Sequence, residues 1–84
     1  MTNNIYLESF VSRGKNRKEV MISLLTGRKT QAEIHKITKL YRTHVRRCLN
    51  ELIEKKLVKC LNPKDRINKW YELTLLGKEI IKKL

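Results

Sequence analysis

Acidic residues and long apolar runs are scarce in this sequence, and each shortage excludes a class of protein. Only eight of the 84 residues are Asp or Glu, and the single aspartate is Asp65. Clustered carboxylates, a phosphate-binding glycine loop and a Gly-x-Ser-x-Gly motif are all missing, so we predict neither an enzyme nor a cofactor. No stretch approaches the roughly 18 apolar residues of a membrane span, and the polar start lacks a signal-peptide core. We therefore expect a cytoplasmic protein with no membrane partner.

Cysteine is also scarce, with only Cys48 and Cys60 in the chain. In a reducing cytoplasm both are expected to be free thiols. His44 and Cys48 are four residues apart, a spacing that lets two ligands share a metal, but no Cys-x-x-Cys or His-x-x-x-His pair accompanies them. Because Cys48 falls in an apolar stripe, we predict a core residue there and no metal site. No small-molecule ligand is evident.

Positive charge, by contrast, is abundant, with twenty Lys and Arg and a formal net charge of +12. Thirteen of these cations lie between Arg28 and Lys69, where only four acids oppose them. Self-repulsion of such charge costs folding energy, so it is most easily explained by a polyanionic partner. Nucleic acid is the first candidate and an anionic membrane surface the second, but the concentration of charge on the middle helices and the hairpin argues against the membrane. The alternative is a generally Lys-rich proteome with solvated charged faces.

The stretch from Thr30 to Val58 predicts two helices joined by a tight turn. Thr30 and Glu33 have the spacing of a capping box at a helix start. After Leu40, apolar residues recur at helical spacing along a second, longer helix: Val45, Cys48, Leu49, Leu52 and Ile53. The intervening residues are polar and face away from that stripe: Arg42, Thr43, His44, Arg46 and Arg47. A short packed helix that presents a basic second helix is the plan of a helix-turn-helix DNA reader.

The flanking segments predict the remaining elements. An earlier helix is expected to start at Asn16 in a capping box with Glu19 and to end at Gly27. Residues 57–61 and 69–74 predict a two-stranded hairpin with a basic tip, and Thr74 can cap a last helix over residues 75–84. Residues 1–13 are either an N-terminal arm or a short helix, ahead of a domain spanning residues 14–84.

The aromatic pair of the second strand has two open interpretations. Strand alternation sends Trp70 and Tyr71 to opposite faces. The first interpretation places Tyr71 and Leu73 inward and Trp70 outward, near DNA or a partner subunit. The second makes Trp70 a partly buried lid on the core.

Three strings carry a resemblance to a known family: ELIEKKLVK, LVKCLNPKDR followed by WYELT, and YELTLLGKEIIKK. In this order they resemble winged helix-turn-helix transcriptional regulators, in particular small archaeal MarR/ArsR-like DNA-binding proteins. The resemblance implies a mainly α fold with a small β-hairpin, built from a three-helix core, a two-stranded wing and a C-terminal helix. The chain departs from the family at three positions, where small residues, Gly and Ser or Thr are usual: His35, Lys39 and Tyr41.

The resemblance also implies sequence-specific binding of double-stranded DNA, usually by a homodimer. The recognition helix would begin near Tyr41 and offer the major groove six residues: Tyr41, Arg42, Thr43, His44, Arg46 and Arg47. Wing residues would meet the flanking backbone or a minor groove: Lys64, Arg66 and Lys69. We expect further backbone contacts at the start of the preceding helix, from Lys29, Thr30 and Gln31.

Two alternatives keep the fold but change the function. The winged helix could serve as a protein-interaction module of the transcription or replication machinery. It could also be an abundant protein that coats DNA without sequence specificity. An arginine that binds guanine through both arms of its fork discriminates by about 1–3 kcal/mol, so specificity of this size separates a regulator from both alternatives.

Overall fold

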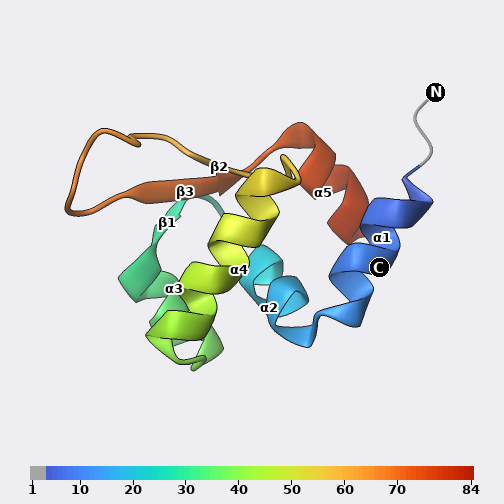
Figure 1. Cartoon of the computed structure of the whole chain (residues 1–84), viewed down its shortest axis with the longest axis horizontal. Helices are drawn as coiled ribbons and strands as arrows, with labels where there is room; N and C mark the ends of the chain where they lie inside the picture. Colours follow the sequence, from blue (N-terminus) through green and yellow to red (C-terminus); the bar gives the residue numbers. More distant parts are fainter. Residues whose placement is uncertain (1–3) are drawn as a thin grey trace.

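The computed structural model describes residues 4–84, in which five helices and three short strands follow one another (Figure 1). Their order and bounds are α1 (Ile5–Arg13), α2 (Lys15–Ser23), β1 (Lys29–Thr30), α3 (Gln31–Thr38), α4 (Arg42–Glu54), β2 (Val58–Cys60), β3 (Trp70–Leu73) and α5 (Leu75–Lys82). The loop between β2 and β3 extends away from the helices as a wing (Figure 1). The predicted fold class, a three-helix core with a wing and a C-terminal helix, is confirmed.

One apolar core joins all five helices and the two longer strands. The predicted stripe of α4 faces it: Val45 and Leu52 are fully buried, and Cys48 is 5% exposed. The rest of the chain contributes Val11, Val20, Met21, Ile34, Leu57, Val58, Leu73 and Ile80, of which Leu57 lies in the connection between α4 and β2. Each fully buried aliphatic side chain stabilises the fold by about 1.5–3 kcal/mol. This packing fixes how every helix is rotated about its own axis.

Two of the three predicted helix caps are confirmed. Thr30 and Glu33 form a complete capping box at the start of α3, and the Thr74 hydroxyl accepts a hydrogen bond from the Gly77 amide at the start of α5. The predicted cap at Asn16 is wrong, because α2 begins one residue earlier and its N-cap is Gly14, without a side-chain hydrogen bond. A Cβ on Gly14 would lie 2.5 Å from Cδ of Arg17. The tight corner after α1 therefore fixes this helix start.

The end of α2 also comes earlier than predicted. The helix stops at Ser23, and residues 24–26 form a turn ahead of Gly27. The amides of Leu24 and Leu25 bond to carbonyls three residues back, which tightens the last turn.

The sheet has three antiparallel strands in the order β1-β3-β2, one more than the predicted hairpin. In the predicted part, Val58 pairs with Leu73 and Cys60 with Tyr71. The additional strand β1 pairs Lys29 with Tyr71 across the other edge of β3. Its two residues carry no alternating pattern, so sequence periodicity cannot detect it. The pairing attaches the wing to the start of α3.

The N-terminal segment is a helix in the described residues, which settles the open choice between arm and helix there. Helix α1 packs on α2 and α5, and its Val11 is fully buried. Leu7 and Phe10 pack against the same core. Residues 1–3 of the predicted arm lie outside the described part of the chain.

At Gly77 the backbone of α5 lies close to the backbone of Leu57, just before β2. A Cβ at this position would collide with the backbone carbonyl oxygen of Leu57. We expect Gly77→Ala to lower the free energy of unfolding by about 1–3 kcal/mol, the usual cost of overpacking. Urea unfolding monitored by Trp70 fluorescence measures the change. The control Lys78→Ala, at an exposed position on the same helix, should stay within about 0.5 kcal/mol of the wild type; equal stability of both variants would contradict the packing.

Candidate nucleic-acid interface

The outer face of α4 is basic and open to solvent. Arg42, Arg46 and Arg47 are exposed, whereas Val45 and Cys48 between and beside them are buried. No ion pair joins these guanidinium groups to an acid of residues 4–84. Thr43 is exposed as well, and Tyr41 at the N-cap is 75% exposed. The predicted division of α4 into a buried and an exposed face is therefore confirmed, while the DNA-binding role of the exposed residues stays a prediction.

The turn between α3 and α4 explains two departures from the family pattern. Lys39 adopts the left-handed conformation, with φ of 62°, that usually favours glycine. Where the family usually has a small residue, this chain has His35. Nδ1 of His35 forms a hydrogen bond with the carbonyl oxygen of Leu40, so the larger side chain stabilises the turn. Both larger residues are thus accommodated locally, and the two helices keep their contact.

The third departure leaves the start of α4 without a side-chain cap. Tyr41 occupies the N-cap position in an extended conformation, and its side chain accepts no cap hydrogen bond. Its ring instead meets His44 edge to face, with centroids 5.7 Å apart. His44 is consequently half-buried rather than fully open. The first amides of α4 lack a side-chain acceptor, which suits an anion near the positive end of the helix.

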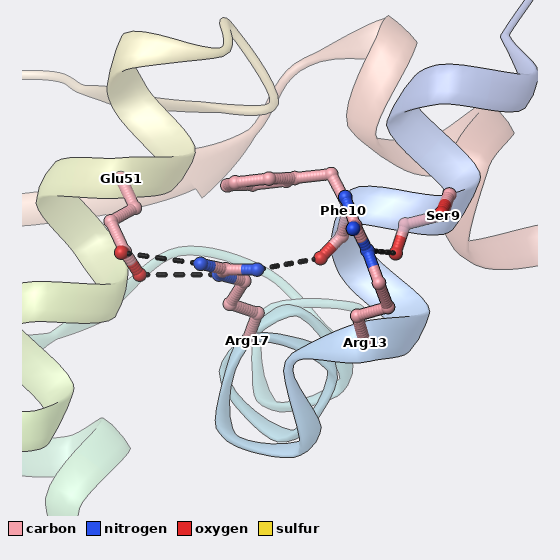
Figure 2. A network of polar contacts seen from close by, with 5 residues as sticks. All are labelled: Ser9, Phe10, Arg13, Arg17 and Glu51. Carbon is pink, nitrogen blue, oxygen red and sulfur yellow. Dashed lines mark hydrogen bonds and ion pairs between the residues drawn. The ribbon is translucent and has the colours of Figure 1, made fainter.

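An arginine from α2 fastens α4 to the α1–α2 corner (Figure 2). Nε and Nη2 of Arg17 bind the two carboxylate oxygens of Glu51 at 3.2 and 3.3 Å. Nη1 donates to the carbonyl oxygen of Phe10 at 2.8 Å, and the guanidinium lies 3.9 Å from the centroid of the Phe10 ring. Each of the three guanidinium nitrogens makes a hydrogen bond, so this cation holds α4 in place against the α1–α2 corner and its charge is paired with Glu51. Sequence reasoning missed this pair because its members are 34 residues apart.

A groove of about 380 Å³ separates α4 from the wing. Its lining comes from the start of α3, from α4 and from the wing: Gln31, Arg46, Leu49, Asn50, Arg66, Lys69 and Tyr71. A smaller hollow of about 180 Å³ adjoins it and is lined by Thr30 and Asn68 among others. Neither lining contains a carboxylate. The structure thus brings together predicted residues from the start of α3 (Gln31), from α4 (Arg46) and from the wing (Arg66 and Lys69).

The other predicted residues lie outside this groove or use their side chains elsewhere. Lys64 is exposed at the tip of the wing. Nζ of Lys29 donates to Oγ1 of Thr26 at 3.0 Å, and the hydroxyl of Thr30 caps α3. Of the three residues predicted at the helix start, Gln31 therefore faces the groove most directly, and its Nε2 donates to the carbonyl oxygen of Arg42 at 3.4 Å.

The wing is shaped by one asparagine. Nδ2 of Asn62 donates to Asp65 at 2.8 Å and to the carbonyl of Asn68 at 3.1 Å, while its Oδ1 accepts from the Trp70 amide at 2.7 Å. Asn68 itself is left-handed, with φ of 58°. These bonds close the loop across its base, so Lys64 and the residues beside it project from a defined turn.

The two aromatic residues of β3 match each interpretation in part: Tyr71 faces the core, as the first expected, whereas Trp70 is partly buried, as the second expected. Tyr71 packs against the core and Leu73 is buried. Trp70 is half-buried, with the guanidinium of Arg28 4.9 Å from its ring centroid. Partial burial raises the pKa of Tyr71 above its usual value, and Cys60 raises it further, whereas nearby Arg46 opposes the shift. The phenol is therefore neutral at physiological pH and serves as a donor or acceptor in the groove.

The remaining chemistry of the site is sparse. Both cysteines are free, and burial raises the pKa of the Cys48 thiol, with Glu51 adding to the effect. Across the described chain, no group of three or more His, Cys, Asp and Glu is placed to hold a metal ion. None of the helices within residues 4–84 is long and apolar enough to cross a bilayer.

Sequence comparison gives one family. The model of the family described as TFIIE alpha subunit matches residues 7–80. A search among curated proteins finds no match.

Comparison with solved structures identifies MarR-type winged-helix neighbours. The apo form of wild-type MarR from E. coli is 24% identical with a TM-score of 0.75, over 92% of this chain and 61% of that one. Bordetella bronchiseptica BpsR, whose DNA binding is regulated by 6-hydroxynicotinic acid, is 22% identical with a TM-score of 0.77, over 82% of this chain and 54% of that one. TubR from Bacillus thuringiensis serovar israelensis pBtoxis, bound to 24 bp of tubC, is 14% identical with a TM-score of 0.83, over 99% and 92%.

These likenesses show a shared fold. The chain spans between 54% and 61% of the length of BpsR and MarR, and 92% of TubR. It therefore has the winged-helix fold that MarR family transcription regulators share.

The asparagine that closes the wing makes a testable contribution. Asn62→Ala removes the acceptor of the Trp70 amide and both donors to the loop, and each lost hydrogen bond costs about 0.5–1.5 kcal/mol. We expect faster hydrogen exchange of the Trp70 amide, by roughly tenfold for a loss of 1.4 kcal/mol, with the helical core unchanged. Lys64→Ala at the same tip is the control and should leave this exchange rate unaltered. Equal exchange rates of the Trp70 amide in Asn62→Ala and the wild type would contradict the role of Asn62 in closing the wing.

Proposed function

The chain belongs to the TFIIE alpha subunit family, and we propose that it is a non-enzymatic transcription regulator that binds double-stranded DNA. One observation carries the proposal. Arg42, Arg46 and Arg47 project from α4 with no acid partner among residues 4–84, and Arg46 lines a groove whose charged lining residues are all cations. Exposed guanidinium groups without acid partners on a helix fit the major groove of a duplex, which admits one α-helix. The winged-helix neighbours, one of them bound to DNA, support the same conclusion.

We assign base recognition to the first half of α4. Arg42 and Arg46 are four residues apart and share a face, so both can reach base edges in one major groove. The Arg fork matches guanine O6 and N7. Thr43 and His44 would contact base edges or phosphates in the first turn, and Tyr41 would flank them.

Affinity that is independent of sequence would come from the wing and from the start of α3. Lys64, Arg66 and Lys69 would hold the flanking backbone or minor groove, and Arg66 and Lys69 share their groove with Arg46. We assign the backbone contact at the helix start mainly to Gln31, with Lys29 and Thr30 beside it. Residues 14–84 would form the DNA-binding domain, with residues 1–13 preceding it; of these, Ile5–Arg13 form helix α1.

We further propose that two copies act together. Ile5 and Tyr6 on α1 and Leu84 at the chain end are apolar or aromatic and exposed, and α1 packs beside α5. A homodimer through this end would leave both copies of α4 free. Half-sites are then expected about 34 Å apart, one helical turn of DNA.

A second candidate is favoured by the family itself, whose description names a subunit. In that case the winged helix would act as a protein-interaction module of the transcription machinery. Negligible binding of the chain to any duplex at low salt would favour this candidate.

The recognition role predicts a selective loss of affinity. We expect the double variant Arg42→Gln/Arg46→Gln to bind its preferred site roughly 30-fold or more weakly, since two bidentate contacts contribute at least about 2 kcal/mol. Binding to a random duplex should fall much less. The matched control is Lys78→Gln/Lys82→Gln on α5, which removes two exposed charges at the other end of the molecule from the α3–α4 turn (Figure 1). Fluorescence anisotropy on both duplexes measures the effects, and equal losses on both would indicate a non-specific coating protein.

Selection of bound sequences from a random duplex pool tests specificity and symmetry together. The expected result is an enriched motif containing guanines, repeated as an inverted pair about 10 base pairs apart. A single, unrepeated motif would contradict the dimer while leaving recognition intact. A pool with no enrichment would contradict sequence-specific regulation.

A further inference from the structure

A second basic groove lies along α4, apart from the groove beside the wing. It has a volume of about 320 Å³ and runs between α4 and the corner where α1 turns into α2. The corner contributes Arg13, Gly14, Lys15, Asn16 and Arg17, and α4 contributes Arg47, Cys48 and Glu51. Except for Arg47, none of these residues belongs to the recognition helix start, the wing or the start of α3.

The charges in this groove do not cancel. Its one carboxylate, Glu51, is held by Arg17 through both oxygens, so these two residues neutralise each other (Figure 2). Arg13, Lys15 and Arg47 form no ion pair within the described residues. Arg13 donates its Nε to the carbonyl of Ser9 at 3.3 Å, which orients the side chain and leaves its terminal nitrogens available. Three cations therefore line the groove without an acidic partner among the described residues.

The position of this groove follows from the helix geometry of α4. Arg46 and Arg47 are consecutive and point about 100° apart. Arg46 lines the groove beside the wing, whereas Arg47 lines the groove beside the α1–α2 corner. Helix α4 thus carries a basic groove along each flank.

Duplex DNA offers two phosphate backbones to a helix in this arrangement. The major groove is about 12 Å wide, and an α-helix with side chains is about 10–12 Å across, so each flank of an inserted helix faces one backbone. The wing and its groove would meet one of them. The other backbone would then run beside the α1–α2 corner.

We propose that Arg13, Lys15 and Arg47 form a phosphate-binding site for the backbone that borders the major groove on the side away from the wing. This inference rests on the proposed function and adds a third region, the α1–α2 corner, to its DNA-binding surface. The Arg17–Glu51 pair keeps the corner against α4, so the three free cations are held in place before DNA binds.

The salt dependence of DNA binding tests this site. Each phosphate contact contributes about −0.9 to the slope of log K against log salt concentration. For Arg13→Gln/Lys15→Gln we expect a slope about 1.8 units shallower than the wild-type slope. Across a fourfold rise in salt, the variant should therefore lose about twelvefold less affinity than the wild type. Lys15→Gln alone should give half this change in slope. In hydroxyl-radical footprints, DNA bound to Arg13→Gln/Lys15→Gln should lose protection only along the backbone on the side away from the wing.

The control Lys78→Gln/Lys82→Gln removes the same charge from α5 and separates a site from a general charge effect. A slope change equal to that of Arg13→Gln/Lys15→Gln in this control would overturn the site, as would an unchanged slope in Arg13→Gln/Lys15→Gln. In either case, binding of the wild-type chain to duplex DNA would still support the proposed function. A wild-type chain that binds no duplex at low salt would overturn both. The wild type and the three variants are compared at equal helix content by circular dichroism.

Discussion

Burial of the apolar stripe of α4 is the constraint on which the rest of the structure depends. Val45 and Leu52 are fully buried and Leu49 is 1% exposed, and each contributes about 1.5–3 kcal/mol through burial. A rotation of α4 by one residue would expose part of this stripe and bury a guanidinium without a partner, which costs several kcal/mol more. The core therefore decides which side chains of α4 face outward. Packing of the apolar stripe against the core thus places the arginines of α4 on the surface.

The distribution of acids leaves the cations of the first half of α4 and of the wing without ion pairs among the described residues. The ion pairs of the described chain join Arg17 to Glu51, Lys59 to Glu72 and Lys83 to Glu8. None involves the first half of α4 or the tip of the wing. The three paired carboxylates thus fasten helices and strands, while the arginines in the first half of α4 and the wing cations form no ion pair within residues 4–84. Such a surface carries a cost in self-repulsion that a polyanion would relieve.

Sequence patterns were sufficient where the determining contacts are local. The caps at Thr30 and Thr74 depend on residues three positions away, and the stripe of α4 depends on helical periodicity. Features set by distant contacts were not predictable in this way. Strand β1 exists only because β3 lies beside it, and the corner at Gly14 is shaped by Arg17, which in turn binds Glu51 across 34 residues. For the same reason Gln31, Arg46, Arg66 and Lys69 of the wing groove could be proposed individually from the sequence, whereas Asn50 and the groove at the α1–α2 corner emerged only from the folded chain.

A nuclear magnetic resonance titration with a short duplex tests the central claim most directly, since it reports every surface of the protein in one experiment. The account predicts chemical-shift changes concentrated in residues 41–47 and 62–69, with smaller changes at residues 13–15 and a core that keeps its shifts. Changes confined to α1 and α5, with the guanidinium signals of α4 unaffected by DNA, would contradict it.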